Sequence, residues 1–129
     1  MNPALEGVTL LDLSDGIAGP YAAMFLTDMG ARTIKLESPL TNHERSQASF
    51  SVWNRGKESV TADLDTPGGR AVALRLAQEA DVVVATFSRR RARALGLDYP
   101  SLRRANERLI YCSLSAYGEA GPLSLKPTT

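Results

Sequence analysis

Residues 7–37, "GVTLLDLSDGIAGPYAAMFLTDMGARTIKLE", hold the pattern that decides the fold class. The run VTLLDLS is short, apolar and rich in strand-forming residues, so it predicts a buried strand. Pro20 suits the first turn of a helix and Gly30 suits its end, and the apolar residues between them recur at helical spacing. The run ARTIKLE then predicts a second strand, with Ile34 and Leu36 on one face.

The same alternation continues to the end of the chain. Thr66 and Pro67 make a strong helix start, with threonine as the N-cap and proline in the first turn. We expect three more strands, at 58–64, 81–87 and 108–118. Three more helical segments are expected at 66–80, 88–97 and 99–106. Residues 38–56 show neither period, so they predict a long loop with at most one helical turn.

Strands that alternate with helices predict an α/β fold. We expect a Rossmann-like, mostly parallel sheet of about five strands with helices on both faces. Residues 1–118 would form this domain, and residues 119–129 would be a C-terminal extension in coil conformation.

Composition narrows the function classes. The chain has 129 residues, 43% of them hydrophobic, and a net charge of +1, which does not suit a nucleic-acid or membrane-surface partner. No leader and no apolar run long enough to span a membrane is evident. The single cysteine, Cys112, allows no internal disulfide, so a cytoplasmic location is expected. No metal-ligand spacing occurs, so no metal is expected.

Ligands of doubly wound folds bind beyond the carboxyl ends of the strands. Those ends are predicted at Ser14–Pro20, Glu37–Ser38, Leu64–Asp65, Phe87–Arg91 and Ser115–Gly118. The small residues of the first turn would let a ligand approach the backbone, and a helix N-terminus attracts phosphate. The alternative is an ordinary tight turn, because neither the dinucleotide-binding glycine pattern nor a P-loop is present.

Four arginines lie within five positions after the fourth predicted strand, at Arg89, Arg90, Arg91 and Arg93. Guanidinium groups bind phosphates well, although such a run is more commonly a solvated helix face. His43, the only histidine, has no serine or cysteine partner in view, and Cys112 lies within a strand. The sequence therefore predicts no catalytic residue.

Three segments together are similar to one family. They are "LEGVTLLDLSDGIAGPYAAMFLTDMGARTIKLESP", "NRGKESVTADLDTPGGRAVALRLAQEADVVVATF" and "LGLDYPSLRRANERLIYCSLSAYGEAGP", and they cover nearly the whole chain in order. The chain resembles the class III CoA-transferases, which include formyl-CoA and carnitine CoA-transferases and the related α-methylacyl-CoA racemases.

The resemblance implies that coenzyme A or an acyl-CoA is the substrate. Carried over by position, the CoA-binding residues would be Ile17, Ala18, Ser38, Ala62 to Asp65, Thr86, Phe87, Ser88, Ala94 and Ser115 to Gly118, Tyr117 included. Arg89, Arg90, Arg91 or Arg93 would pair with the phosphates, an assignment that rests on charge and position.

Several positions depart from the family pattern. The usual Glu-Asn-Phe-Arg-Pro-Gly after the fourth strand is replaced by residues 85–90, ATFSRR, although Phe87 keeps the pattern. An arginine common in transferases falls on Ala94, and the usual Gly-Asp after the second strand reads Thr41-Asn42. Lys57 also keeps the pattern. These departures predict an altered or weakened CoA site.

The resemblance also implies where the chemistry lies. Family members are several times longer, and the transferase nucleophile is an aspartate beyond Gly121-Pro122, past the end of this chain. The racemase histidine would fall near Thr129. We therefore expect the chain to be the family's first Rossmann-like half, with little or no turnover by itself. In full-length relatives two subunits interlock as rings, so a homodimer or a complementing chain is the expected partner.

Three functions remain open at this stage. The first is the CoA-binding N-terminal part of a transferase that moves CoA between carboxylic acids, with a 2-methylacyl-CoA racemase fragment as its close alternative. The second is a non-catalytic subunit that binds CoA or a protein partner. The third is an ordinary nucleotide-binding domain, which the missing glycine pattern disfavours.

Overall fold

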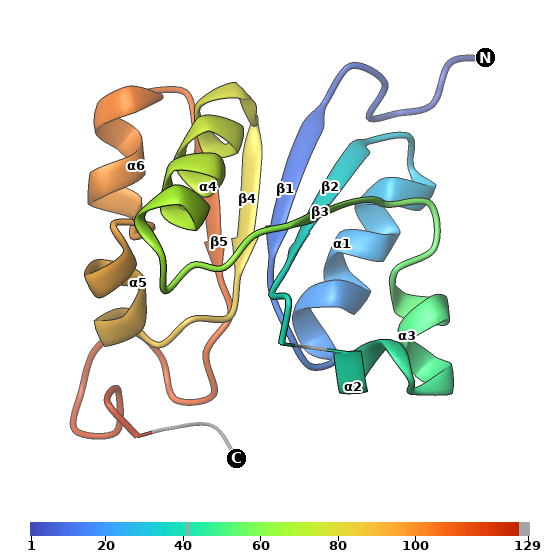
Figure 1. Ribbon diagram of the computed structural model, residues 1–129. Helices are drawn as coiled ribbons and strands as arrows, with labels where there is room; N and C mark the ends of the chain where they lie inside the picture. Colours follow the sequence, from blue (N-terminus) through green and yellow to red (C-terminus); the bar gives the residue numbers. More distant parts are fainter. Residues whose placement is uncertain (41, 127–129) are drawn as a thin grey trace.

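Strands and helices alternate along the chain, as the computed structural model in Figure 1 shows. The model describes residues 1–40 and 42–126, with the backbone alone for residues 42 and 43. The elements are β1 (Thr9–Leu13), α1 (Ala18–Asp28), β2 (Arg32–Glu37), α2 (Asn42–Arg45), α3 (Ala48–Trp53), β3 (Glu58–Thr61), α4 (Pro67–Glu79), β4 (Val82–Ala85), α5 (Arg89–Leu95), α6 (Tyr99–Ala105) and β5 (Ile110–Ser113).

The five strands form one sheet in the order β3-β2-β1-β4-β5, and every neighbouring pair is parallel. Leu11 of the central strand β1 lies opposite Ile34 of β2 on one side and Val83 of β4 on the other. The predicted fold class is confirmed. Because β2 and β3 wind away from β1 in one direction and β4 and β5 in the other, the winding reverses between β1 and β4, where such folds bind ligands.

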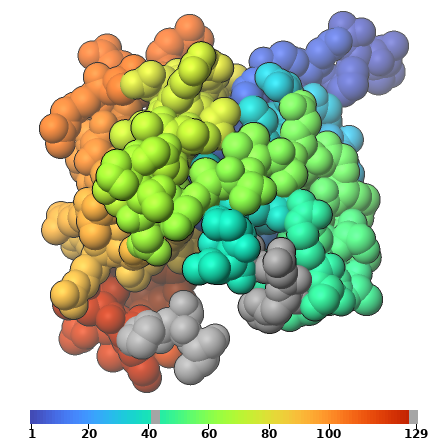
Figure 2. All heavy atoms as spheres, viewed as in Figure 1, coloured from blue at the N-terminus to red at the C-terminus, as the bar shows by residue number. Residues whose placement is uncertain are grey.

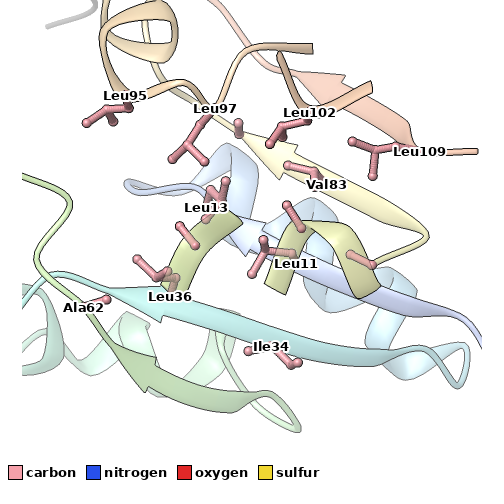
Figure 3. Packing of buried hydrophobic residues seen from close by; sticks show 14 residues of the cluster. Leu11, Leu13, Ile34, Leu36, Ala62, Val83, Leu95, Leu97, Leu102 and Leu109 are labelled. Carbon is pink, nitrogen blue, oxygen red and sulfur yellow. The ribbon is translucent and has the colours of Figure 1, made fainter. Parts of the chain in front are cut away.

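Alternation along β1 divides its side chains between the two faces of the sheet. Leu11 and Leu13 join the larger core beneath α4, α5 and α6 (Figure 3). Leu10 packs with Ala23 of α1 on the opposite face. Helices therefore cover both faces, and the predicted shared face of Ile34 and Leu36 is confirmed by their place in the larger core.

Local helix signals behave as expected. The Thr66 hydroxyl accepts a hydrogen bond from the Gly69 N–H at 3.0 Å, which caps α4, and Pro67 follows in the first turn. Ser88 caps α5 in the same way through the Arg91 N–H at 3.2 Å. Helix α1 begins at Ala18, so Pro20 lies in its first turn, as expected.

Four sequence predictions need correction in their extent. Strands β3, β4 and β5 are shorter than expected. Strand β3 pairs with β2 only as far as Glu37, where β2 ends, and β5 pairs with β4 only as far as the bond from the Leu114 N–H to the Ala85 carbonyl. The segment 38–56 holds two short helices rather than a loop with one turn. Trp53 anchors α3 there, with its ring 5.0 Å from Tyr21 of α1. Residues 119–126 form turns, with neither helix nor strand.

Candidate functional site

A cavity of about 380 Å³ opens at the carboxyl ends of the strands, where the winding reverses. Its lining comes from the ends of β1, β2, β3 and β4 and includes Ser38, Asp65, Thr86, Phe87 and Ser88. In Figure 2 the surface is hollowed at the lower edge of the molecule, below the teal segment that follows β2. The cavity falls within the range of about 300–1,000 Å³ that is usual for small-molecule sites.

A second, smaller cavity of about 140 Å³ adjoins the first, because Thr86, Phe87 and Ser88 line both. Ser115 and Tyr117 line the second cavity, and so does Arg89. The structure thus gathers predicted residues from β2, β3, β4 and β5 along one edge of the sheet.

Six predicted site residues lie elsewhere. Ile17 lines a separate small cavity beside α3 and is 64% exposed. Ala18 is exposed at the start of α1, and Arg93 lines a cavity between α5, α6 and β5. Ala62 is buried in the larger core. Arg90 and Ala94 are exposed on α5. Their contact with CoA stays a prediction.

The turn after β1 serves the packing of the chain itself. Gly16 has a φ of +70°, a conformation that side chains disfavour. Gly19 lies so close to Ser14 that a Cβ at this position would overlap the Ser14 side chain. The Thr86 hydroxyl accepts from the Asp15 N–H at 3.0 Å and donates to the Asp15 carboxylate at 2.8 Å, which ties the end of β1 to the end of β4.

A buried ion pair lies beneath this turn. The Lys57 ammonium donates to Asp12 Oδ2 at 2.8 Å, to the Pro20 carbonyl at 2.9 Å and to Asn54 Oδ1 at 2.9 Å. The side chains of Lys57 and Asp12 are 1% and 0% exposed. Burial lowers the pKa of Lys57, and the Asp12 carboxylate opposes that shift.

A second lysine shares the same carboxylate. Lys35 Nζ lies 3.7 Å from Asp12 Oδ2 and donates to the Ser14 carbonyl at 2.7 Å. Lys35 also lines the 380 Å³ cavity, so the cluster of Asp12, Lys35 and Lys57 connects the turn to the site. The alternating pattern of β2 gave no sign that Lys35 is buried. Asp12 within an apolar strand was the available signal, because a buried carboxylate needs a cation.

Glu37 at the end of β2 is held by Arg45 of α2. The guanidinium donates to both carboxylate oxygens, at 2.6 and 2.7 Å, and Ser59 Oγ donates at 2.9 Å. This paired contact places α2 beside the cavity, which Glu44 also lines. Glu37 was predicted only as the end of a strand, and its partner Arg45 was not predicted, because residues 38–56 show neither a helix nor a strand period.

A larger cavity of about 710 Å³ lies between α5, α6 and β5. Tyr111 lines it and donates through its hydroxyl to the Leu97 carbonyl at 2.9 Å. Burial, followed by the Glu119 and Asp98 carboxylates, raises the pKa of Tyr111 to about 12.

We expect one of the four tyrosines to titrate late in the folded protein. Alkaline titration followed by phenolate absorbance should give a last phase near pH 12, and Tyr111→Phe should remove it. The unfolded protein loses this proton near pH 10, so the folded state binds more protons above that pH and its free energy of unfolding falls as pH rises. A titration in which Tyr111→Phe leaves the late phase in place would contradict the assignment.

Among residues 1–40 and 42–126, no cluster of three or more candidate ligands could hold a metal ion, and no helix is long and apolar enough to cross a membrane. The side chain of His43 and all of Thr41 and Thr129 lie outside the described residues, so the predictions for them stay open.

The chain matches one protein family over almost its whole length. The family model for CoA-transferase family III matches residues 5–129. The succinate–glutarate CoA-transferase of Agrobacterium fabrum is 40% identical over 93% of this chain and 34% of its own length. The human α-methylacyl-CoA racemase is 38% identical over 92% of this chain and 30% of its own length.

A solved structure agrees with this match. The crystal structure of the protein Rv3272 of Mycobacterium tuberculosis is 40% identical, with a TM-score of 0.92 over 100% of this chain and 38% of that chain. The chain therefore spans about a third of the length of the relatives it matches. Because the family model covers nearly all of its residues, the chain belongs to CoA-transferase family III.

Proposed function

We propose that this chain is the CoA-binding N-terminal part of a family III CoA-transferase, which moves CoA between carboxylic acids when the rest of the family fold completes it. The observation that carries the proposal is the 380 Å³ cavity at the point where the winding of the sheet reverses. Family membership supports CoA thioesters as the substrate class.

Different residues around the strand-end cavities suit different parts of CoA. Phe87, shared by both strand-end cavities, offers an apolar surface for the adenine ring. Carboxylates in the lining accept hydrogen bonds from hydroxyl and amino groups. Arg91 lines the larger of these two cavities and Arg89 the smaller, and their guanidinium groups suit the phosphates.

The division of labour follows from what these residues can do. This chain would hold the nucleotide and so retain the CoA thiol near the place where the acyl group is transferred. The carboxylate that exchanges acyl groups with CoA would come from the completing part of the fold, as covalent catalysis by an aspartate. A homodimer or a complementing chain would supply that part.

The first test is a calorimetric titration of the purified chain with CoA. Arg89→Ala/Arg91→Ala should weaken binding about tenfold or more, because each lost charge-assisted hydrogen bond is worth about 1.5 kcal/mol or more. The matched control is Arg103→Ala/Arg104→Ala, which removes two exposed arginines from the last turn of α6, far from the strand ends. It should leave the dissociation constant within about twofold, because separated surface charges are screened.

Two outcomes of this titration would contradict the proposal. If the folded chain binds no CoA at millimolar concentration, the CoA-binding role is wrong and a partner-binding subunit becomes the better account. If both double variants weaken binding equally, the arginines act only through net charge, and the assignment of phosphates to α5 fails.

A further inference from the structure

Arg91 and Asp65 meet across the mouth of the 380 Å³ cavity, which both residues line. Arg91 Nη2 donates to Asp65 Oδ1 at 2.6 Å, and the two residues stand 26 positions apart in the sequence. We propose that Asp65 lowers the phosphate affinity of this site, because its carboxylate pairs with the guanidinium that a ligand phosphate would need and takes up its Nη2 donor. The inference rests on the proposed CoA-binding function.

The charges around the cavity make Arg91 the decisive cation. The described lining carries two cationic side chains, Lys35 and Arg91, against five carboxylates, at Asp15, Glu37, Glu44, Asp63 and Asp65. Lys35 is buried and already bound to the Ser14 carbonyl and near Asp12. Arg91 is 45% exposed, so it is the cation within reach of a ligand that enters from solvent.

The backbone on both sides of the mouth is held in place. The Asp65 N–H donates to Asp63 Oδ1 at 2.9 Å, within the turn that leads into α4. The Arg91 N–H donates to the Ser88 cap of α5 at 3.2 Å. The ion pair therefore forms between two fixed segments, and a phosphate must displace the Asp65 carboxylate in order to use the Nη2 donor of Arg91.

Exposure limits the size of the effect. The Asp65 side chain is 68% exposed, and ion pairs between exposed side chains are worth about 0.2–1 kcal/mol. Releasing Arg91 from Asp65 should therefore tighten phosphate binding by up to about fivefold. Repulsion between the Asp65 carboxylate and the phosphate acts in the same direction, and added salt screens it.

The test is a set of calorimetric titrations with CoA at low ionic strength on the chain and three variants. Asp65→Asn should bind CoA more tightly than the unaltered chain, by up to about fivefold. In the Arg91→Ala background the same substitution should give a clearly smaller gain, because it then relieves only the repulsion between the Asp65 carboxylate and the phosphate. Pantetheine, which carries no phosphate, should bind equally to the chain and to Asp65→Asn.

A charge control separates local competition from net charge. Glu107→Gln removes one exposed carboxylate just before the amino end of β5, whereas the cavity lies at the carboxyl ends of the strands. It should leave CoA binding unchanged. If the chain binds CoA and Asp65→Asn gains nothing, or gains as much without Arg91, the inference is overturned while the proposed function stands. If neither the chain nor Asp65→Asn binds CoA or pantetheine, the proposed function itself fails.

Discussion

Asp12→Asn should destabilise the folded chain by about 3–5 kcal/mol, because it strands two buried ammonium groups without their carboxylate. Lys57 and Lys35 lie 2.8 and 3.7 Å from Asp12 Oδ2, and all three side chains are at most 5% exposed. An amide keeps the shape of the side chain but not its charge. Urea denaturation followed by circular dichroism measures the loss.

Charge balance predicts an unequal response from the two sides of this cluster. Lys57→Met removes one of two cations and leaves Lys35 paired with Asp12, so its cost should be clearly smaller than that of Asp12→Asn. Adding Lys57→Met to Asp12→Asn should recover part of the lost stability, because one uncompensated charge is then gone. Equal losses for both single variants would show that packing, rather than charge, decides the stability of the cluster.

Among glycine-to-alanine substitutions in the described part of the chain, Gly69→Ala should lower the free energy of unfolding most. A Cβ at Gly69 would overlap the Asp63 carbonyl oxygen and carbon, which are backbone atoms that cannot rotate away. Overpacking of this kind costs about 1–3 kcal/mol and at times more. Because Asp63 begins the turn that carries Asp65, the substitution should also disturb the mouth of the cavity.

The neighbouring glycine supplies a matched control. Gly68 lies in the same first turn of α4, and a Cβ there would meet nothing within 4 Å. Gly68→Ala should therefore be neutral or stabilise the chain by up to about 1 kcal/mol, since alanine restricts the unfolded chain and favours the helix. A similar loss in both variants, measured by thermal unfolding, would contradict the steric explanation.

The sequence predicts a structural element well where the residues that determine it are neighbours in the chain. The strand–turn–helix–strand pattern of residues 7–37 and the cap at Thr66 are local, and both predictions are confirmed. The ends of β3 and β5 depend on the length of the neighbouring strand, which no residue within them encodes. The two helices within 38–56 owe their position to contacts such as that between Trp53 and Tyr21, 32 residues apart along the chain (53 minus 21).

The candidate site shows the same division. Strand ends could be located from the pattern, so Ser38, Asp65 and Thr86 were predicted together and do line one cavity. The ion pair of Asp65 could not be predicted, because Arg91 and Asp65 lie on segments that only the folded sheet brings together. Their part in binding CoA stays a prediction that the titrations address.

The central position of β1 also governs the order in which the chain can fold. Its edge toward β2 can pair as soon as residue 37 is available, and β3 can follow within the same half of the chain. Its other edge must wait for β4, and the hydrogen bond from the Thr9 N–H to the Asp81 carboxylate closes a span of 72 residues. Closing so long a loop costs entropy before any contact repays it, so we expect the return of β4 to β1 to be slower than the pairing of β1 with β2.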